Sequence, residues 1–143
     1  MCLRWRQRRV PAGAPALGAV VSSSSDIARL FAFLKSEPRE HLYAVHIDAG
    51  NRVIGLELLG MGGLTHAPCP IADLFRAALL SGAAGILLVH QHPSGRAHPS
   101  LADIQLTDQV ARAGKLLGVG LLDHVIIGAR GHYSFSDRGT LPR

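Results

Sequence analysis

The chain has 143 residues, of which 48% are hydrophobic and 17% are charged, and this composition is typical of one folded domain rather than of a disordered chain. Its two cysteines, Cys2 and Cys69, are too few for a disulfide framework or a cysteine-based zinc site, so we expect a reducing, cytoplasmic location. No apolar run reaches the roughly 18 residues that a membrane-spanning helix needs, so we expect no membrane association.

The net charge of +5 belongs mainly to one end of the chain. Four arginines precede every acidic residue: Arg4, Arg6, Arg8 and Arg9. The remaining eleven basic and ten acidic residues leave the rest nearly neutral, so we expect weak nucleic-acid binding or none. Residues 10–21 are rich in alanine, glycine and proline. We therefore interpret residues 1–18 as a flexible basic leader and residues 19–143 as one domain.

The first half of the chain predicts a short helix followed by a hairpin. Residues 22–37 begin with serines that can cap a helix, continue with apolar residues at helical spacing, and end at a proline. Residues 41–48 alternate in hydrophobicity, as a strand does, and a tight turn at 49–51 leads to a partner strand at 52–59. After several glycines we expect a short extended piece near residues 64–67.

The second half predicts alternating helices and strands. A helix begins at Pro70, and a buried strand follows at residues 85–89. A second long helix runs from Ser100 through about Gly114, and further strands lie at residues 119–127 and 132–135. This order predicts an α/β fold in which helices flank a mixed sheet.

The most informative stretch joins the strand at 85–89 to the following helix. If the chain stays extended past Val89, His90 and His92 project from the same face of the strand. Asp103 falls in the first turn of a helix capped by Ser100. Each piece has an ordinary structural reading, since Ser-x-x-Asp is most often a capping box. Together they place three nitrogen and oxygen ligands at one point, which is typical of a catalytic zinc site.

The whole string, H-x-H-P-x6-S-x2-D behind an apolar strand, resembles the motif of the JAMM/MPN+ metalloproteases. Pro93-Ser94-Gly95 and Pro99-Ser100 are similar to the RadC-like branch of that family, and the likeness extends from about residue 19 to residue 139. Gln91 stands where most JAMM enzymes carry a small hydroxyl residue and RadC-like members usually carry asparagine. The resemblance implies a single MPN (JAB) domain with cytidine-deaminase-like layering.

The resemblance also implies roles for particular residues. One zinc ion per chain would be held by His90, His92 and Asp103, and Glu40 matches the glutamate that activates the zinc-bound water. Ser100 matches the hydroxyl residue that donates to the developing oxyanion, although a helix cap uses the same side chain. The residues alone do not identify the general base. The chain has three glutamates, Glu37, Glu40 and Glu57, and the side chain of Glu57 could face either side of its strand.

Two further histidines lie near the motif. We expect His124 to be packed or hydrogen-bonded, and to contact the metal ligands from behind through Asp123. His98 lies in the predicted loop, where we expect it to be exposed.

Two functions compete on this sequence. The first is a zinc-dependent peptidase or isopeptidase that hydrolyses an amide bond in a peptide or isopeptide substrate, including release of a ubiquitin-like modifier. The alternative is a non-catalytic zinc-binding module of the RadC type, associated with DNA repair or recombination, which the nearly neutral domain disfavours. A homodimer is compatible with either. A zinc nucleobase deaminase is excluded, because that chemistry uses His-x-Glu and Pro-Cys-x-x-Cys, whereas Cys69 stands alone before the histidines.

Overall fold

The computed structural model describes residues 17–61 and 70–143. Its elements in chain order are α1 (Ser24–Leu30), the 3₁₀ turn η1 (Ala32–Ser36), β1 (His41–Ile47), β2 (Val53–Met61), α2 (Ile71–Ser81), β3 (Gly85–Gln91), α3 (Leu101–Leu117), β4 (Gly120–Ile127) and β5 (His132–Ser134). The extended piece predicted near residues 64–67 and nearly all of the predicted leader lie outside the described residues. Within the described ranges, no helix is both long enough and apolar enough to cross a membrane.

The five strands form one mixed sheet in the order β2-β1-β3-β4-β5. Only β3 and β4 are parallel, and the remaining neighbours are antiparallel. The predicted hairpin joins β1 to β2 through a turn in which Asn51 has a positive φ of 59°. The Asp48 carboxylate stabilises this turn, since it accepts hydrogen bonds from the backbone N–H groups of Gly50 and Arg52.

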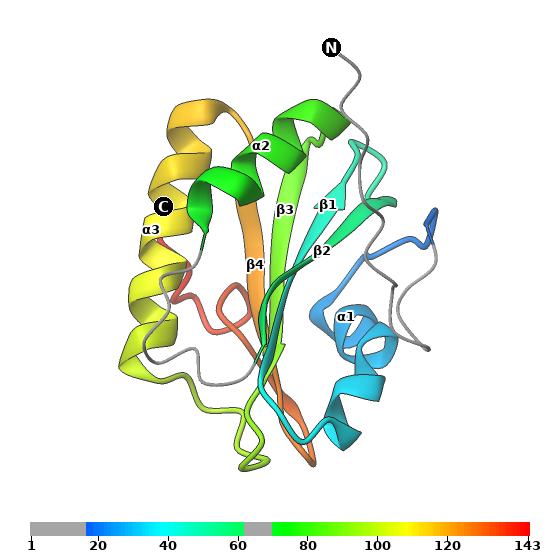
Figure 1. Cartoon of the computed structure of the whole chain (residues 1–143), viewed down its shortest axis with the longest axis vertical. Helices are drawn as coiled ribbons and strands as arrows, with labels where there is room; N and C mark the ends of the chain where they lie inside the picture. Colours follow the sequence, from blue (N-terminus) through cyan, green and yellow to red (C-terminus); the bar gives the residue numbers. More distant parts are fainter. Residues whose placement is uncertain (1–16, 62–69) are drawn as a thin grey trace.

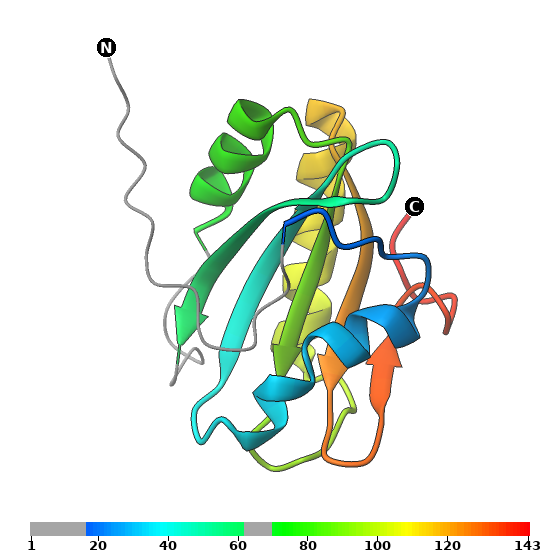
Figure 2. The same ribbon diagram turned by 90° about the vertical axis from the view of Figure 1, so that its right-hand side faces the viewer.

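Helices cover both faces of the sheet, with α1 on one side and α2 and α3 on the other (Figures 1 and 2). The alternation predicted for β1 explains how its side chains divide between two cores. Tyr43, Val45 and Ile47 pack with α1, whereas Ala44 packs with α2 and α3. The predicted mixed sheet flanked by helices is therefore confirmed.

Two helix boundaries differ from the prediction. The first predicted helix is divided into α1 and η1, and the second part has the i to i+3 hydrogen bonds of a 3₁₀ turn, from the Leu34 N–H to the Phe31 carbonyl and from the Glu37 N–H to the Leu34 carbonyl. The helix α3 continues past Gly114 to Leu117 and ends at Gly118, whose φ is 75°. Gly114 lies inside α3 instead, where a side chain would collide with the Val119 carbonyl at the approach to β4.

The loop between β3 and α3 rests against the turn between β4 and β5. Gly95, at a φ of 79°, accepts a hydrogen bond from the Ala129 N–H at 2.9 Å. A Cβ atom at Gly128 would lie 2.9 Å from the Gly95 carbonyl oxygen, so the close approach requires glycine there. This packing supports the loop that carries the first residues after β3 into α3.

Candidate metal centre

Four side chains from three separate parts of the fold converge beside the end of β3. His90 lies in β3, His92 directly after it, Asp103 in the first turn of α3, and Glu40 directly before β1. One ligand atom from each of the four lies within 4.8 Å of the others. Among the described residues this is the group of histidine and acidic side chains that can hold a metal ion.

The local structure explains how the first three meet. His90 and His92 share the α3 side of the sheet because side chains alternate along an extended chain, and their Nε2 atoms lie 3.0 Å apart. Asp103 is oriented by a capping box: its carboxylate accepts from the Ser100 N–H at 2.7 Å, and its own N–H donates to the Ser100 hydroxyl. The carboxylate oxygens then lie 3.1 Å from His90 Nε2 and 3.0 Å from His92 Nε2.

This spacing fits a small cation. Ligand atoms bonded at about 2.0–2.2 Å to a tetrahedral ion lie about 3.3–3.6 Å from one another. The two imidazole nitrogens and the Asp103 carboxylate oxygens lie 3.0–3.1 Å apart, slightly closer than this, so the three side chains need to move only a few tenths of an ångström to bind one ion. Glu40 is slightly farther, with its Oε1 3.6 Å from His90 Nε2, and it is the fourth residue of the group that could hold an ion.

The contacts within the group change the pKa values of Asp103 and His92 in opposite directions. Burial alone would raise the pKa of Asp103, but hydrogen bonds from His90 and His92 and the charge of His90 outweigh burial and hold that pKa far below its ordinary value. The hydrogen bond to Asp103 raises the pKa of His92, although burial opposes the shift. Asp103 is therefore ionised throughout the physiological range, as a metal ligand must be.

Behind His90 lies a hydrogen-bonded pair, His124 and Thr107. The Thr107 hydroxyl donates to the Asp103 carbonyl at 2.6 Å, so its oxygen is left to accept from His124 Nδ1 at 2.7 Å. His124 Nε2 then accepts from His90 Nδ1 at 2.8 Å, so His90 would bind an ion through Nε2, once that nitrogen has given up its hydrogen. Burial lowers the pKa of His124 well below its ordinary value, so this ring is neutral.

His124 reaches the group directly, and not through Asp123 as the sequence led us to expect. Asp123 lies on the α1 side of the sheet, where its carboxylate accepts from the Ser134 hydroxyl and the backbone N–H groups of Ser136 and His124. The structure thus brings His124 to the candidate site and leaves Asp123 outside it. Thr107 was missed by the sequence analysis, although its position four residues after Asp103 on the same helix face was a usable signal.

The structure also separates the three glutamates, all of which it describes. Each lies beside a histidine: Glu37 is 4.0 Å from His41 and Glu57 is 3.6 Å from His46, both outside the metal group. Of the three glutamates, only Glu40 belongs to the four-residue group.

Ser100 is exposed and serves as the helix cap, with its hydroxyl oxygen accepting from Asp103. This contact leaves the hydroxyl hydrogen available, so its role as an oxyanion donor stays a prediction. His98 is exposed, as expected from a loop.

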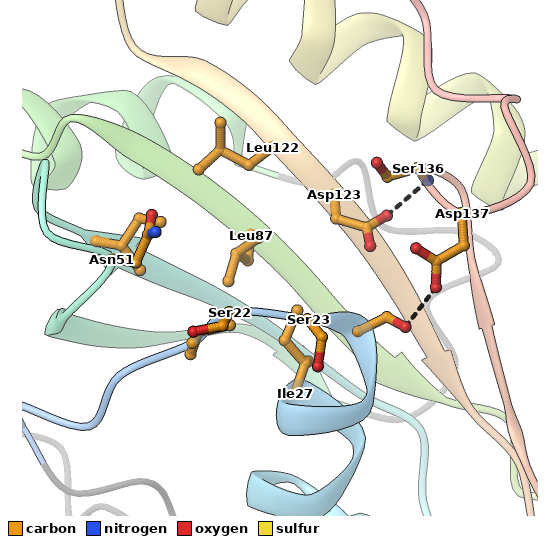
Figure 3. Close-up of a pocket in the computed structure, with 12 residues that line it drawn as sticks. Ser22, Ser23, Ile27, Asn51, Leu87, Leu122, Asp123, Ser136 and Asp137 are labelled. Atoms are coloured by element: carbon orange, nitrogen blue, oxygen red, sulfur yellow. Dashed lines mark hydrogen bonds between the residues drawn. The ribbon is translucent and has the colours of Figure 1, made fainter.

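A pocket of about 220 Å³ lies on the opposite face of the sheet from the metal group, between α1, β4 and the residues after β5. Figure 3 shows Asp123, Ser136 and Asp137 together at one end of it. Hydrogen bonds at this end join the C-terminal segment to α1 and β4: the Ser24 hydroxyl donates to Asp137, and the Ser136 N–H donates to Asp123. The pocket is thus built around a structural network and is separate from the candidate metal centre.

Comparison with known proteins agrees with this geometry. The family model described as RadC-like JAB domain matches residues 21–140. A protein of Pelodictyon phaeoclathratiforme is 40% identical over 105 residues, which cover 73% of this chain and 47% of the relative. A protein of Latilactobacillus sakei is 36% identical over 124 residues, covering 87% and 55%, and one of Methanosarcina mazei is 32% identical over 120 residues, covering 83% and 52%. All three are named UPF0758 protein, a name that states no activity, and the chain spans about half the length of these relatives.

Proposed function

Because the chain belongs to the RadC-like JAB domain family, we propose that it is a zinc-dependent metallopeptidase or isopeptidase that hydrolyses an amide bond. One zinc ion per chain would be held by His90, His92 and Asp103. The observation that carries this proposal is the position of Glu40, a carboxylate beside the three ligands but 3.6 Å from the nearest of them. Three protein ligands with a fourth position left for water form the ligand set of a catalytic zinc site, and in this proposal Glu40 would lie beside that water.

A bound zinc ion would supply Lewis-acid chemistry, lowering the pKa of a water molecule and polarising the substrate carbonyl. Glu40 would take the proton from the attacking water and return it to the leaving amine, the role of a general base and then a general acid. Its side chain is one-quarter exposed, so it can reach both water and substrate. Ser100, at the exposed start of α3, would donate its hydroxyl hydrogen to the developing oxyanion.

The substrate class that this chemistry fits is a peptide or an isopeptide, including one formed by a ubiquitin-like modifier. His92 and Glu40 are partly exposed whereas His90 and Asp103 are buried, so a substrate carbonyl would approach the group past His92 and Glu40. The activity of a longer protein that contains this domain is part of the same proposal, since the curated relatives are about twice as long as the matched region.

The decisive experiment uses Glu40→Gln. The zinc-loaded parent and variant are incubated with a library of peptides and lysine-linked isopeptides, with and without chelator, and cleavage is read by mass spectrometry. We expect the variant to keep its zinc and its fold, because His90, His92 and Asp103 remain and the proposed role of Glu40 is toward the water rather than the zinc. Its activity should fall by roughly 10²–10⁴, the usual contribution of a positioned acid–base group.

Glu37→Gln and Glu57→Gln are the matched controls, since both glutamates lie beside a histidine outside the metal group. Parent-like cleavage by Glu40→Gln contradicts the assigned role of Glu40. A zinc-loaded parent that cleaves nothing in the library favours the non-catalytic module instead.

A further inference from the structure

Gln91 lies between the two histidines in sequence but faces the other side of the sheet. His90 and His92 project towards α3, so the alternation of an extended chain turns Gln91 towards the α1 side. Its side chain is 2% exposed. Because a buried amide needs partners for both its oxygen and its nitrogen, the contacts of Gln91 show what it holds.

Both partners of Gln91 belong to the backbone on either side of Glu40. The side-chain Nε2 donates to the Arg39 carbonyl at 2.5 Å, and the side-chain Oε1 accepts from the His41 N–H at 2.9 Å. The Arg39 carbonyl and the His41 N–H belong to the two peptide groups that flank Glu40. The Arg39 carbonyl also lies 2.8 Å from His41 Nδ1, a second nitrogen that can donate to it.

The sheet itself does not supply this support. Pairing between β1 and β3 begins at Leu42 opposite His90, and β1 begins at His41, so Glu40 lies outside the ladder. Without another contact the backbone at Glu40 would be free to turn where the strand frays. The Gln91 amide replaces the missing ladder contacts, and it does so from the residue that joins the two metal ligands. The position of Glu40 is thereby coupled to the position of His90 and His92.

We propose that Gln91 is the positioning residue for Glu40: its side-chain amide holds the flanking peptide groups so that the Glu40 carboxylate stays beside the metal ligands. The catalytic meaning of this role depends on the function proposed above. The role requires an amide, because both a donor and an acceptor are used.

The test uses Gln91→Met, which keeps the length of the side chain and removes both hydrogen bonds, and Gln91→Asn, which keeps the amide but is one methylene shorter. Gln109→Met is the control, since it makes the same change on the exposed side of α3. Each protein is prepared with ¹³C-labelled glutamate carboxyl groups and loaded with Co²⁺, a paramagnetic ion that accelerates nuclear relaxation steeply as the distance shortens. The chain contains three glutamates, so three carboxyl signals report three distances.

In the parent and in Gln109→Met we expect the Glu40 signal to relax fastest. In Gln91→Met that enhancement should fall several-fold with the Co²⁺ content unchanged, while Glu37 and Glu57 relax as before. Gln91→Asn should show a smaller fall, because it releases one of the two contacts, and it decides the matter should Gln91→Met fail to fold. Amide exchange at His41 should quicken in both variants.

Where the parent cleaves a library peptide, Gln91→Met should lower kcat by about 10²-fold, the cost of displacing a catalytic group by about 1 Å, with KM nearly unchanged. Unchanged Glu40 relaxation in folded, cobalt-loaded variants overturns the role of Gln91 and leaves the proposed function intact. A parent that binds cobalt but cleaves nothing refutes the proposed hydrolysis, and the relaxation measurement still decides whether Gln91 positions Glu40. A parent that binds no cobalt refutes both.

Discussion

Asp103 and Asp123 are carboxylates of nearly equal burial, 7% and 6% exposed, on opposite faces of the same sheet. Burial raises the pKa of both, yet the final directions differ. Hydrogen bonds from two imidazoles and the charge of one of them bring the pKa of Asp103 far below its ordinary value. Asp123 receives only hydroxyl and backbone N–H groups, with the Asp137 carboxylate nearby, and its pKa stays raised.

The difference shows what distinguishes a candidate site from a structural polar network. Hydroxyl and N–H dipoles satisfy the Asp123 oxygens but cannot repay the full cost of burying its charge. Imidazoles can carry a positive charge or bind a cation, so the group around Asp103 suits a charged ligand. Burial of an acidic side chain therefore identifies neither region by itself, and the chemistry of the surrounding donors separates the two.

The largest expected effect comes from Asp103→Asn. We expect zinc affinity to fall by more than about 10²-fold, because loss of a direct ligand should exceed the 10–100-fold cost of losing an outer-shell partner. The asparagine oxygen can still accept from the Ser100 N–H, so the start of α3 should stay folded. Competition with a chromophoric chelator measures the affinity, and Asp123→Asn is the matched control. Equal losses in both variants would remove the distinction between the two regions.

His124→Phe tests whether the group around Asp103 depends on its outer contacts. Phenylalanine keeps the ring stacked on Phe135 but offers no acceptor for His90 Nδ1. We expect zinc affinity to fall by roughly 10–100-fold, the usual cost of losing an outer-shell partner. His98→Phe makes the same change in an exposed loop and should leave the affinity unchanged. Parent-like zinc binding by His124→Phe would show that His90 is oriented by the backbone alone.

The pH dependence of zinc binding gives a third, smaller effect. The pKa of His92 is raised above 6.5, and a metal ion binds only the deprotonated ring. Zinc affinity should therefore be full well above that raised pKa and decline as the pH falls through it, by up to about tenfold per pH unit. Asp103 stays ionised over this range and adds no slope, because its pKa is lowered. Calorimetric titration of zinc between pH 8 and 5.5 measures the slope, and a flat profile contradicts the predicted ligation by His92.

The smallest effect is expected for the stability of Asp123→Asn. A carboxyl whose pKa is raised on folding stabilises the protein fully below the unfolded pKa, and this contribution is lost as the pH rises through the folded pKa. The variant has no carboxyl to ionise, so it should lack that slope. At pH 7 it should match the parent within about 1 kcal/mol, or about 4 °C in Tm.

Thermal melts between pH 3 and 8 measure this difference. Asp123→Ala is the informative companion, because it leaves two buried N–H groups without an acceptor, at about 1–3 kcal/mol each. A strong loss of stability in Asp123→Asn at pH 7 would mean that the charge of Asp123, rather than its hydrogen bonds, holds the C-terminal segment.

Most helices and strands of this protein could be predicted from the sequence, because each depends on a pattern within one short segment of the chain. Hydrophobic periodicity and short continuous apolar runs predicted the described strands and both long helices, since both patterns lie within one element. His90, His92 and Asp103 were grouped for the same reason: they belong to one continuous strand, loop and helix start. The end of α3 was wrongly predicted at Gly114, because the sequence does not distinguish a glycine needed for close packing from a glycine that ends a helix.

Contacts between different helices and strands were determined only by the tertiary structure. The family resemblance pointed to Glu40, but the residues alone did not separate Glu40 from Glu57; the pairing of β1 with β3, Leu42 opposite His90, is what places Glu40 beside the ligands. The sequence likewise did not show which face of the sheet Asp123 and His124 occupy. They lie on opposite faces, and a register shift between Ile86 and Leu87 gives β4 one extra residue before them. Strand register is set by packing across the whole sheet, whereas periodicity within one strand is set by the chain itself, and this is why the ligands were predictable from sequence and the partners around them were not.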